Sequence, residues 1–339
     1  MRAIPQHRIA AYRFALGVAL TTLVALGAVT FLEREIQRHP ARWASYLPEL
    51  PVQGMERLGR STASVVMLGD SVVATVARDD DDTRDLATML DDQLEHESVT
   101  AVVRGATASD LHGAQLRFLA HRERAPRAVV VPINPRSFGR TWDHEPGWQF
   151  SREGAMYEHP ILARAAAVLD FTWGAPSAEA SERVHVICGE HDFGSMRELQ
   201  RSDLGWDAPR EVGRARYVAR YAGDVRVSPR MRDLERLVRA AESLPFVVLV
   251  YVTPVDVGGA RALVGSRELA CIEENLGAIA AVLDGYEGPH LDLSRHFERT
   301  EWFDHPPNEP HEHLRDSARA EVARILAATL EDALARPSR

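Results

Sequence analysis

Short apolar segments alternate with amphipathic helical segments along most of the chain, and this alternation constrains the fold more than any other feature. The predicted strands are Ser64–Leu68, Val99–Val103, Ala128–Val131, Phe246–Val252 and His290–Leu293. The predicted helices are Thr83–Leu94, Ala108–His121, Met231–Ser243, Arg267–Leu283 and Arg315–Ala333. Continuous apolar strands separated by helices are typical of a parallel sheet that is covered on both faces. We therefore expect an α/β fold with three layers and a central parallel sheet.

An uncharged apolar run, Phe14–Leu32, precedes this alternating region. It has the length of about 20 residues that a membrane-spanning helix needs. Arginines lie on both sides of the run, so the positive-inside rule favours a cytoplasmic N-terminus only weakly. A cleaved signal peptide is the alternative, but the run is long for one and no A-x-A site follows it. We expect a single-pass anchor in the cell membrane with the globular part outside the cytoplasm.

These features divide the chain into three parts. Residues 1–33 form the predicted membrane anchor, and residues 34–62 form a proline-containing connector next to the membrane. Residues 63–335 form the α/β domain. Within this domain, residues 139–228 interrupt the alternation and are rich in Trp, Arg, Gly and Glu, so we expect a large, partly helical insertion.

Composition excludes several classes of function. The net charge of −9 and the absence of a basic stripe argue against a nucleic-acid partner. The two cysteines, Cys188 and Cys271, form no metal-ligand pattern, and we expect neither a metal nor a cofactor. A disulfide between them is an open alternative for a domain outside the cytoplasm.

The turn Gly69-Asp70-Ser71 lies between the first predicted strand and a helix start. A serine at the N-terminal end of a helix meets unpaired backbone N–H groups and the positive end of the helix dipole. Both stabilise an oxyanion, so this position suits the nucleophile of an acyl-transfer reaction.

Further polar residues follow the later strands. Gly105 comes after the second strand and Asn134 after the third, and a histidine-rich segment precedes the last helix. In a parallel sheet these strand ends share one edge, where ligand sites form. The Ser71 N–H, the Gly105 N–H and the Asn134 amide are the predicted oxyanion donors, and a histidine is needed to take the serine proton.

With serine, glycine, asparagine and histidine in this order at successive strand ends, the chain resembles the SGNH (GDSL-type) hydrolase superfamily. The resemblance covers roughly residue 64 to the C-terminus and leaves residues 139–228 unmatched. It implies a flavodoxin-like sandwich in which Ser71 is the nucleophile and Gly105 and Asn134 are oxyanion donors. It also implies that a histidine of the last block is the general base.

The last block departs from the family pattern, because it contains no Asp-x-x-His. His313 stands before an amphipathic helix, as the family histidine often does, and is the preferred base; His305 and His311 are the alternatives. Asp304 is the preferred acid partner, with Glu309 less favoured.

The predicted function is a membrane-anchored, extracytoplasmic serine esterase or O-acyltransferase with a Ser-His(-Asp) mechanism. The topology loosely resembles that of proteins that add or remove acyl groups on cell-envelope polymers. The expected substrate is an acylated polysaccharide, a lipid or a small ester, and other envelope proteins are possible partners. The alternative is a catalytically inactive SGNH-like subunit that binds or assembles within an envelope complex.

Overall fold

The structure is a computed structural model of the 339-residue chain. The residues it describes are 6–43, 46, 50–104, 107–139, 150–168, 184–185, 192–193, 217–218, 220–221, 223–297, 302 and 312–336.

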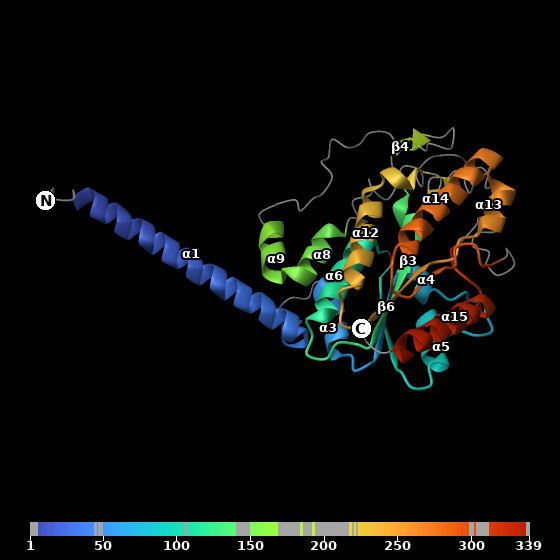
Figure 1. Ribbon diagram of the computed structural model, residues 1–339, viewed down its shortest axis with the longest axis horizontal. Coiled ribbons are helices and arrows are strands. Elements are labelled where there is room, and N and C mark those ends of the chain that lie inside the picture. The colour runs from blue at the N-terminus through green and yellow to red at the C-terminus, as the bar shows by residue number, and fades with distance from the viewer. Residues whose placement is uncertain are drawn as a thin grey trace.

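A five-stranded parallel sheet forms the centre of the molecule (Figure 1). Its strands are β1 (Val65–Gly69), β2 (Val99–Val103), β3 (Ala128–Ile133), β6 (Val247–Val252) and β7 (His290–Asp292). They lie in the order β2-β1-β3-β6-β7, which is the flavodoxin-like order. Each strand end lies within two residues of its predicted position, so the predicted α/β fold class is confirmed.

Side chains alternate between the two faces of the sheet, and each face has its own core. On one face, Val66 and Val129 are fully buried against helices α3 (Leu50–Arg60), α6 (Ser109–Ala120), α12 (Pro229–Ala241) and α14 (Ser266–Asp284). On the other face, Met67 and Val130 are fully buried against α5 (Leu86–Gln93) and α15 (Asp316–Ala335). Figure 1 shows the α5–α15 pair and the α6–α12 pair on opposite sides of the strands.

Capping residues explain where two helices begin. α5 starts at Leu86, three residues later than predicted, because the Asp85 side chain accepts a hydrogen bond from the Thr88 N–H at 2.8 Å. α12 starts at Pro229, two residues earlier than predicted, because Ser228 caps it and proline is favoured in the first helical turn.

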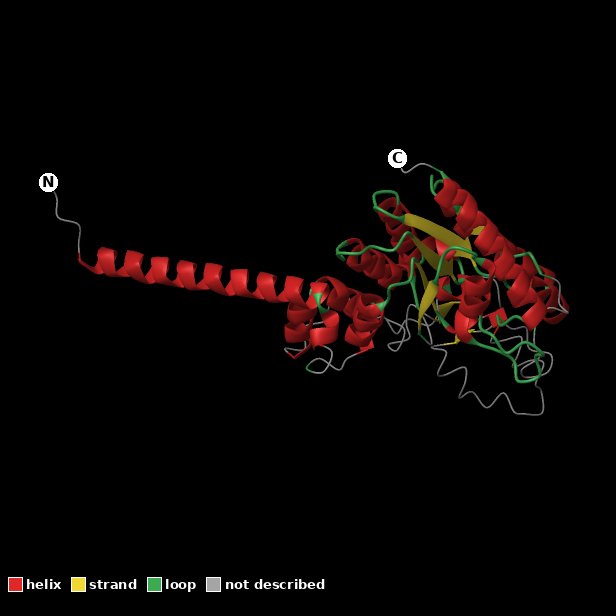
Figure 2. Ribbon diagram, turned by 90° about the horizontal axis from the view of Figure 1, so that it is seen from below, coloured by secondary structure: helices red, strands yellow, loops and turns green. Residues whose placement is uncertain are grey.

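The apolar run Phe14–Leu32 of the predicted anchor lies within one long helix, α1 (Gln6–Arg38), which extends away from the folded part (Figure 2). The stretch Phe14–Arg38 is long and apolar enough to cross a membrane, and its most apolar part is not buried by the rest of the chain. α1 continues beyond the predicted end of the anchor at residue 33, and two helices follow in the predicted connector: α2 (Pro40–Trp43) and α3.

The described parts of the predicted insertion are largely helical. They include α8 (Ser151–Glu158), α9 (Pro160–Val168), a short β4–β5 ladder (Val184–His185 and Asp192–Phe193) and the 3-10 turn η4 (Val225–Val227). A further 3-10 turn, η1 (Pro135–Phe138), directly precedes the insertion. α8 packs on α6 and α3, so this region lies on one helical layer of the sandwich.

A buried histidine on α6 predicts how stability depends on pH. His112 is 1% exposed; its Nδ1 lies 3.2 Å from Gln115 Oε1, and its Nε2 has no hydrogen-bond partner among the described groups. Burial lowers the pKa of His112 to about 4. The unfolded chain, with an ordinary histidine pKa near 6.5, therefore binds this proton more readily than the folded chain.

We expect the contribution of His112 to the free energy of unfolding to be fully present above about pH 6.5 and to fall by roughly 3 kcal/mol as the pH drops to 4. His112→Asn removes the titrating group and should flatten that slope, whereas His121→Gln, at an exposed position just after the same helix, should leave it unchanged. Denaturant unfolding from pH 7 to 4 measures both. An unchanged slope in His112→Asn would contradict this assignment.

Candidate active site

Ser71 is the first residue of the short helix α4 (Ser71–Ala74), directly after β1 and Asp70. Asp70 is the N-cap, and its Oδ1 accepts a hydrogen bond from the Val72 N–H at 2.9 Å. Gly69 is required here, because an added Cβ would lie 2.5 Å from the Val73 side chain. The tight strand-to-helix turn therefore presents the serine at the carboxyl edge of the sheet.

His313 lies beside this serine. Its Nε2 is 3.3 Å from Ser71 Oγ, although the two residues are 242 positions apart in the sequence. This separation is slightly longer than an ideal hydrogen bond, and such contacts are often loose before substrate binds. The arrangement provides the nucleophile–base contact that acyl transfer requires.

The segment that carries His313 is held to the segment that follows Ser71. Arg319, fully buried on α15, donates to the Leu314 carbonyl at 2.8 Å and to Asp80 Oδ2 at 2.6 Å. Its second nitrogen donates to the Asp82 carbonyl at 2.8 Å. The ion pair thus fixes the residue after His313 against the loop that follows α4.

This ion pair gives the acidic run Asp79–Asp82 a structural role. The Asp79 side chain is exposed, but the Asp80 side chain is 1% exposed and pairs with Arg319. The run therefore docks α15 onto the loop. Within the described residues, no group of acidic, histidine or cysteine side chains is arranged to hold a metal ion.

A buried polar network lies behind the Ser71–His313 pair. The Asn134 Nδ2 donates to Asp70 Oδ2 at 3.0 Å and to Glu312 Oε2 at 3.2 Å. Its Oδ1 accepts from the Arg136 N–H at 3.0 Å, and the Arg136 guanidinium forms an ion pair with Glu312. Asn134 thus connects the residue before Ser71 with the residue before His313.

The two carboxylates of this network have opposite pKa shifts. Burial, together with the charge of Glu312, raises the pKa of Asp70. Burial also acts to raise the pKa of Glu312, but Arg136, His313 and the Asn134 hydrogen bond outweigh it and hold that pKa below its ordinary value. Of the two carboxylates Glu312 therefore holds its negative charge more readily, and that charge interacts with His313.

The structure brings together Ser71, His313 and Asn134 among the predicted site residues. Gly105, Asp304, Glu309 and the alternative bases His305 and His311 lie outside the described residues. The sequence assigned no role to Glu312. The adjacency of Glu312 to His313 was visible there, but only the fold shows that its carboxylate is buried and paired.

The chain matches no model of a known protein family and no curated protein sequence. Among solved structures it is similar to Axe2, an acetylxylan esterase from Geobacillus stearothermophilus. The identity is 11% and the TM-score 0.35, covering 82% of this chain and 96% of that chain. A catalytic mutant of the same esterase gives 11% identity and a TM-score of 0.34, covering 82% and 98% of the two chains. We therefore infer the function from the positions of this chain's own residues.

Proposed function

We propose that the chain is a membrane-anchored serine esterase or O-acyltransferase of SGNH type. The observation that carries this proposal is the 3.3 Å approach of His313 Nε2 to Ser71 Oγ at the carboxyl edge of a parallel sheet. An imidazole in this position makes a serine hydroxyl reactive toward an ester carbonyl.

In the proposed reaction, His313 Nε2 takes the Ser71 hydroxyl proton while Oγ attacks the ester carbonyl carbon. The tetrahedral intermediate then expels the alcohol, which receives the proton from His313, and an acyl group remains on Ser71. Water or an acceptor alcohol gives a proton to His313 and attacks the acyl carbonyl, which releases an acid or a new ester and restores Ser71.

The proposed oxyanion donors are the Ser71 N–H, the Gly105 N–H and the Asn134 amide. Both hydrogens of the Asn134 amide are directed at carboxylates, Asp70 and Glu312. When substrate binds, Asn134 must therefore break one of these two hydrogen bonds and donate that hydrogen to the oxyanion instead.

We propose Glu312 as the carboxylate that stabilises the protonated state of His313, because it is charged, buried and next to that imidazole. Asp304 remains the alternative partner. This role does not require a direct bond to the ring: a negative charge a few ångströms away lowers the free energy of the imidazolium.

The anchor and a disulfide support the proposed location. α1 carries a candidate membrane span, and Cys271 is disulfide-bonded, as is typical of proteins outside the cytoplasm. A site held at the outer surface of the membrane suits ester groups of an envelope polysaccharide or lipid, with other envelope proteins as partners.

An inactive binding or assembly subunit is the second candidate, and the bonds that occupy the Asn134 amide favour it. Pre-steady-state hydrolysis of 4-nitrophenyl acetate by the full-length chain in detergent separates the two. An acyl-enzyme mechanism predicts a burst of about one nitrophenolate per chain. Ser243→Ala, at an exposed serine far from the site, is the matched control and should keep the burst. Absence of both burst and turnover in the folded protein would favour the binding subunit.

A further inference from the structure

In the part of the chain that the structure describes, exposed large apolar side chains gather at one end of the molecule. Among the described residues they all lie on α1 except two, Tyr46 and Leu162. Leu162 is on α9 and is 42% exposed; Tyr46 is 75% exposed and makes an edge-on ring contact with Trp43 at 6.3 Å. Single exposed apolar residues are normal on a protein surface. Here, however, Tyr46 comes shortly after α1 in the sequence, and Leu162 lies beside α1 in the structure.

α9 is attached to α1 just beyond the end of the apolar run. Glu33, which directly follows Leu32, is buried; its Oε1 accepts from the Leu162 N–H at 3.2 Å and its Oε2 lies 3.3 Å from His159 Nδ1. One turn later, the Gln37 Nε2 donates to the carbonyls of Tyr157 at 3.1 Å and Glu158 at 2.7 Å. α1 thus caps the start of α9 and the end of α8.

These bonds place α9 beside the C-terminal turns of α1, as Figure 1 shows. The helix has the sequence PILARAAAV, with one charged residue, Arg164. Pro160 and Ala163 are buried, while Leu162 and Ala165 are exposed. The exposed side of α9 is therefore apolar, and it lies at the level where α1 leaves its apolar run.

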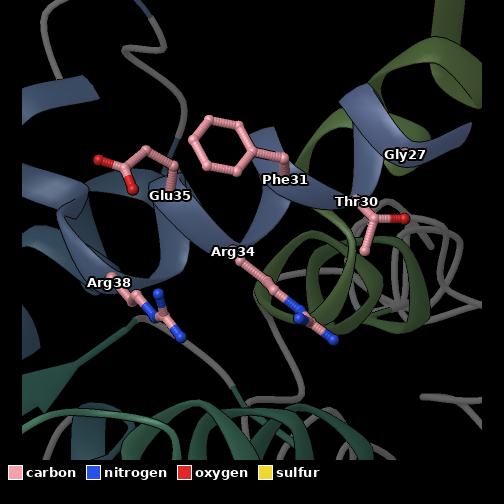
Figure 3. A pocket seen from close by; sticks show the side chains of 6 residues that line it. All are labelled: Gly27, Thr30, Phe31, Arg34, Glu35 and Arg38. Carbon is pink, nitrogen blue, oxygen red and sulfur yellow. The ribbon is translucent and has the colours of Figure 1, made fainter. Parts of the chain in front are cut away.

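Basic side chains lie at the same level. Figure 3 shows Arg34 and Arg38 projecting from one side of α1 and Phe31 and Glu35 from the other. Together with Gly27 and Thr30, these residues line a hollow of about 350 Å³. Neither arginine takes part in an ion pair within the part of the chain that the structure describes. Arginines at the end of a membrane span are well placed for lipid phosphates.

We propose that α9 is a second membrane contact, in which Leu162 and the apolar side of the helix lie in the interfacial region of the bilayer. Tyr46, Arg34 and Arg38 complete the contact at headgroup level. Aromatic residues and arginines at this depth are typical of membrane interfaces. The proposal depends on α1 being a membrane anchor, but not on the chemistry of Ser71. Its consequence is that the α/β domain is held against the membrane in one orientation.

Depth-dependent quenching tests this contact. The full-length chain is reconstituted into nanodiscs of phosphatidylcholine and phosphatidylglycerol, with an environment-sensitive fluorophore at Leu162→Cys and a doxyl quencher on the lipid. Leu32→Cys, at the end of the apolar run of α1, shows whether the anchor lies in the bilayer. Ala328→Cys, exposed on α15 on the other side of the sheet, is the matched control. The unsubstituted chain, carried through labelling, gives the background.

Quenching at Leu162→Cys close to that at Leu32→Cys, with none at Ala328→Cys, is the expected result. Quenching at Leu32→Cys but not at Leu162→Cys would show that α9 does not contact the bilayer, although α1 does cross it. No quenching at either position would contradict both the α9 contact and the membrane anchor. If Leu162→Cys does not fold, hydrogen exchange of the unsubstituted chain replaces it: α9 should exchange more slowly in nanodiscs than in detergent, and equal rates would contradict the proposal.

Discussion

Ser71→Ala and His313→Ala are each expected to lower kcat/KM for ester hydrolysis by about 10⁴-fold to 10⁶-fold. Without the hydroxyl there is no nucleophile, and without the imidazole no described group within hydrogen-bond reach takes its proton. Because the two residues act as one unit, the double variant should be no slower than the slower single variant. Initial rates with 4-nitrophenyl acetate, together with circular dichroism to confirm folding, measure all three variants.

Variants of the two alternative histidines test whether His313 is the base. His305→Ala and His311→Ala should keep most of the wild-type rate if His313 is the base. If His313→Ala retained activity while one of the other two variants lost it, the assignment of the base would be wrong. Multiplicative losses in the double variant would show that Ser71 and His313 do not act together.

Glu312→Ala is expected to lower the free energy of unfolding by about 3–5 kcal/mol, because it leaves the Arg136 charge without its buried partner. It also removes one of the two acceptors that hold the Asn134 amide. Loss of this restraint should lower kcat by about 10²-fold, the cost of a small misplacement of a catalytic group. Denaturant unfolding and steady-state kinetics measure the two effects separately.

Glu312→Gln separates charge from packing. It keeps an acceptor for Asn134 but removes the negative charge next to His313, so the pKa of His313 should fall and the acidic limb of the pH–rate profile should move to lower pH. Glu331→Gln, at an exposed glutamate on α15, is the matched control and should change neither property. An unshifted profile in Glu312→Gln would contradict a role for the Glu312 charge in catalysis.

Local patterns predicted the framework well, because each of its elements is a local property of the chain. The valine-rich runs at residues 65–68 and 129–131 form buried strands, since such segments satisfy both faces of a covered sheet. Gly69-Asp70-Ser71 forms the expected strand-to-helix turn, since the glycine has no Cβ and the aspartate caps the helix. The resemblance to SGNH hydrolases predicts His313 as the preferred base, and the fold places His313 beside Ser71.

Partners of buried charges could not be predicted in the same way. Asp80 and Arg319 are 239 positions apart, and nothing in a run of four acidic residues indicates that the second one is buried. The hydrogen bond between Asn134 and Glu312 spans 178 positions, so the acceptors of that amide were invisible in the sequence. Periodicity shows which face of an element is buried; it does not show which distant charge meets it there.

Covalent labelling with a fluorophosphonate tests whether Ser71 is a nucleophile that His313 activates. The full-length folded protein is treated with the probe, and the modified residue is located by mass spectrometry of the digested chain. We expect phosphonylation of Ser71 Oγ in the wild type, none in Ser71→Ala, and much slower labelling in His313→Ala. Labelling that persists in Ser71→Ala, or a folded wild-type protein that does not react at all, would contradict this expectation.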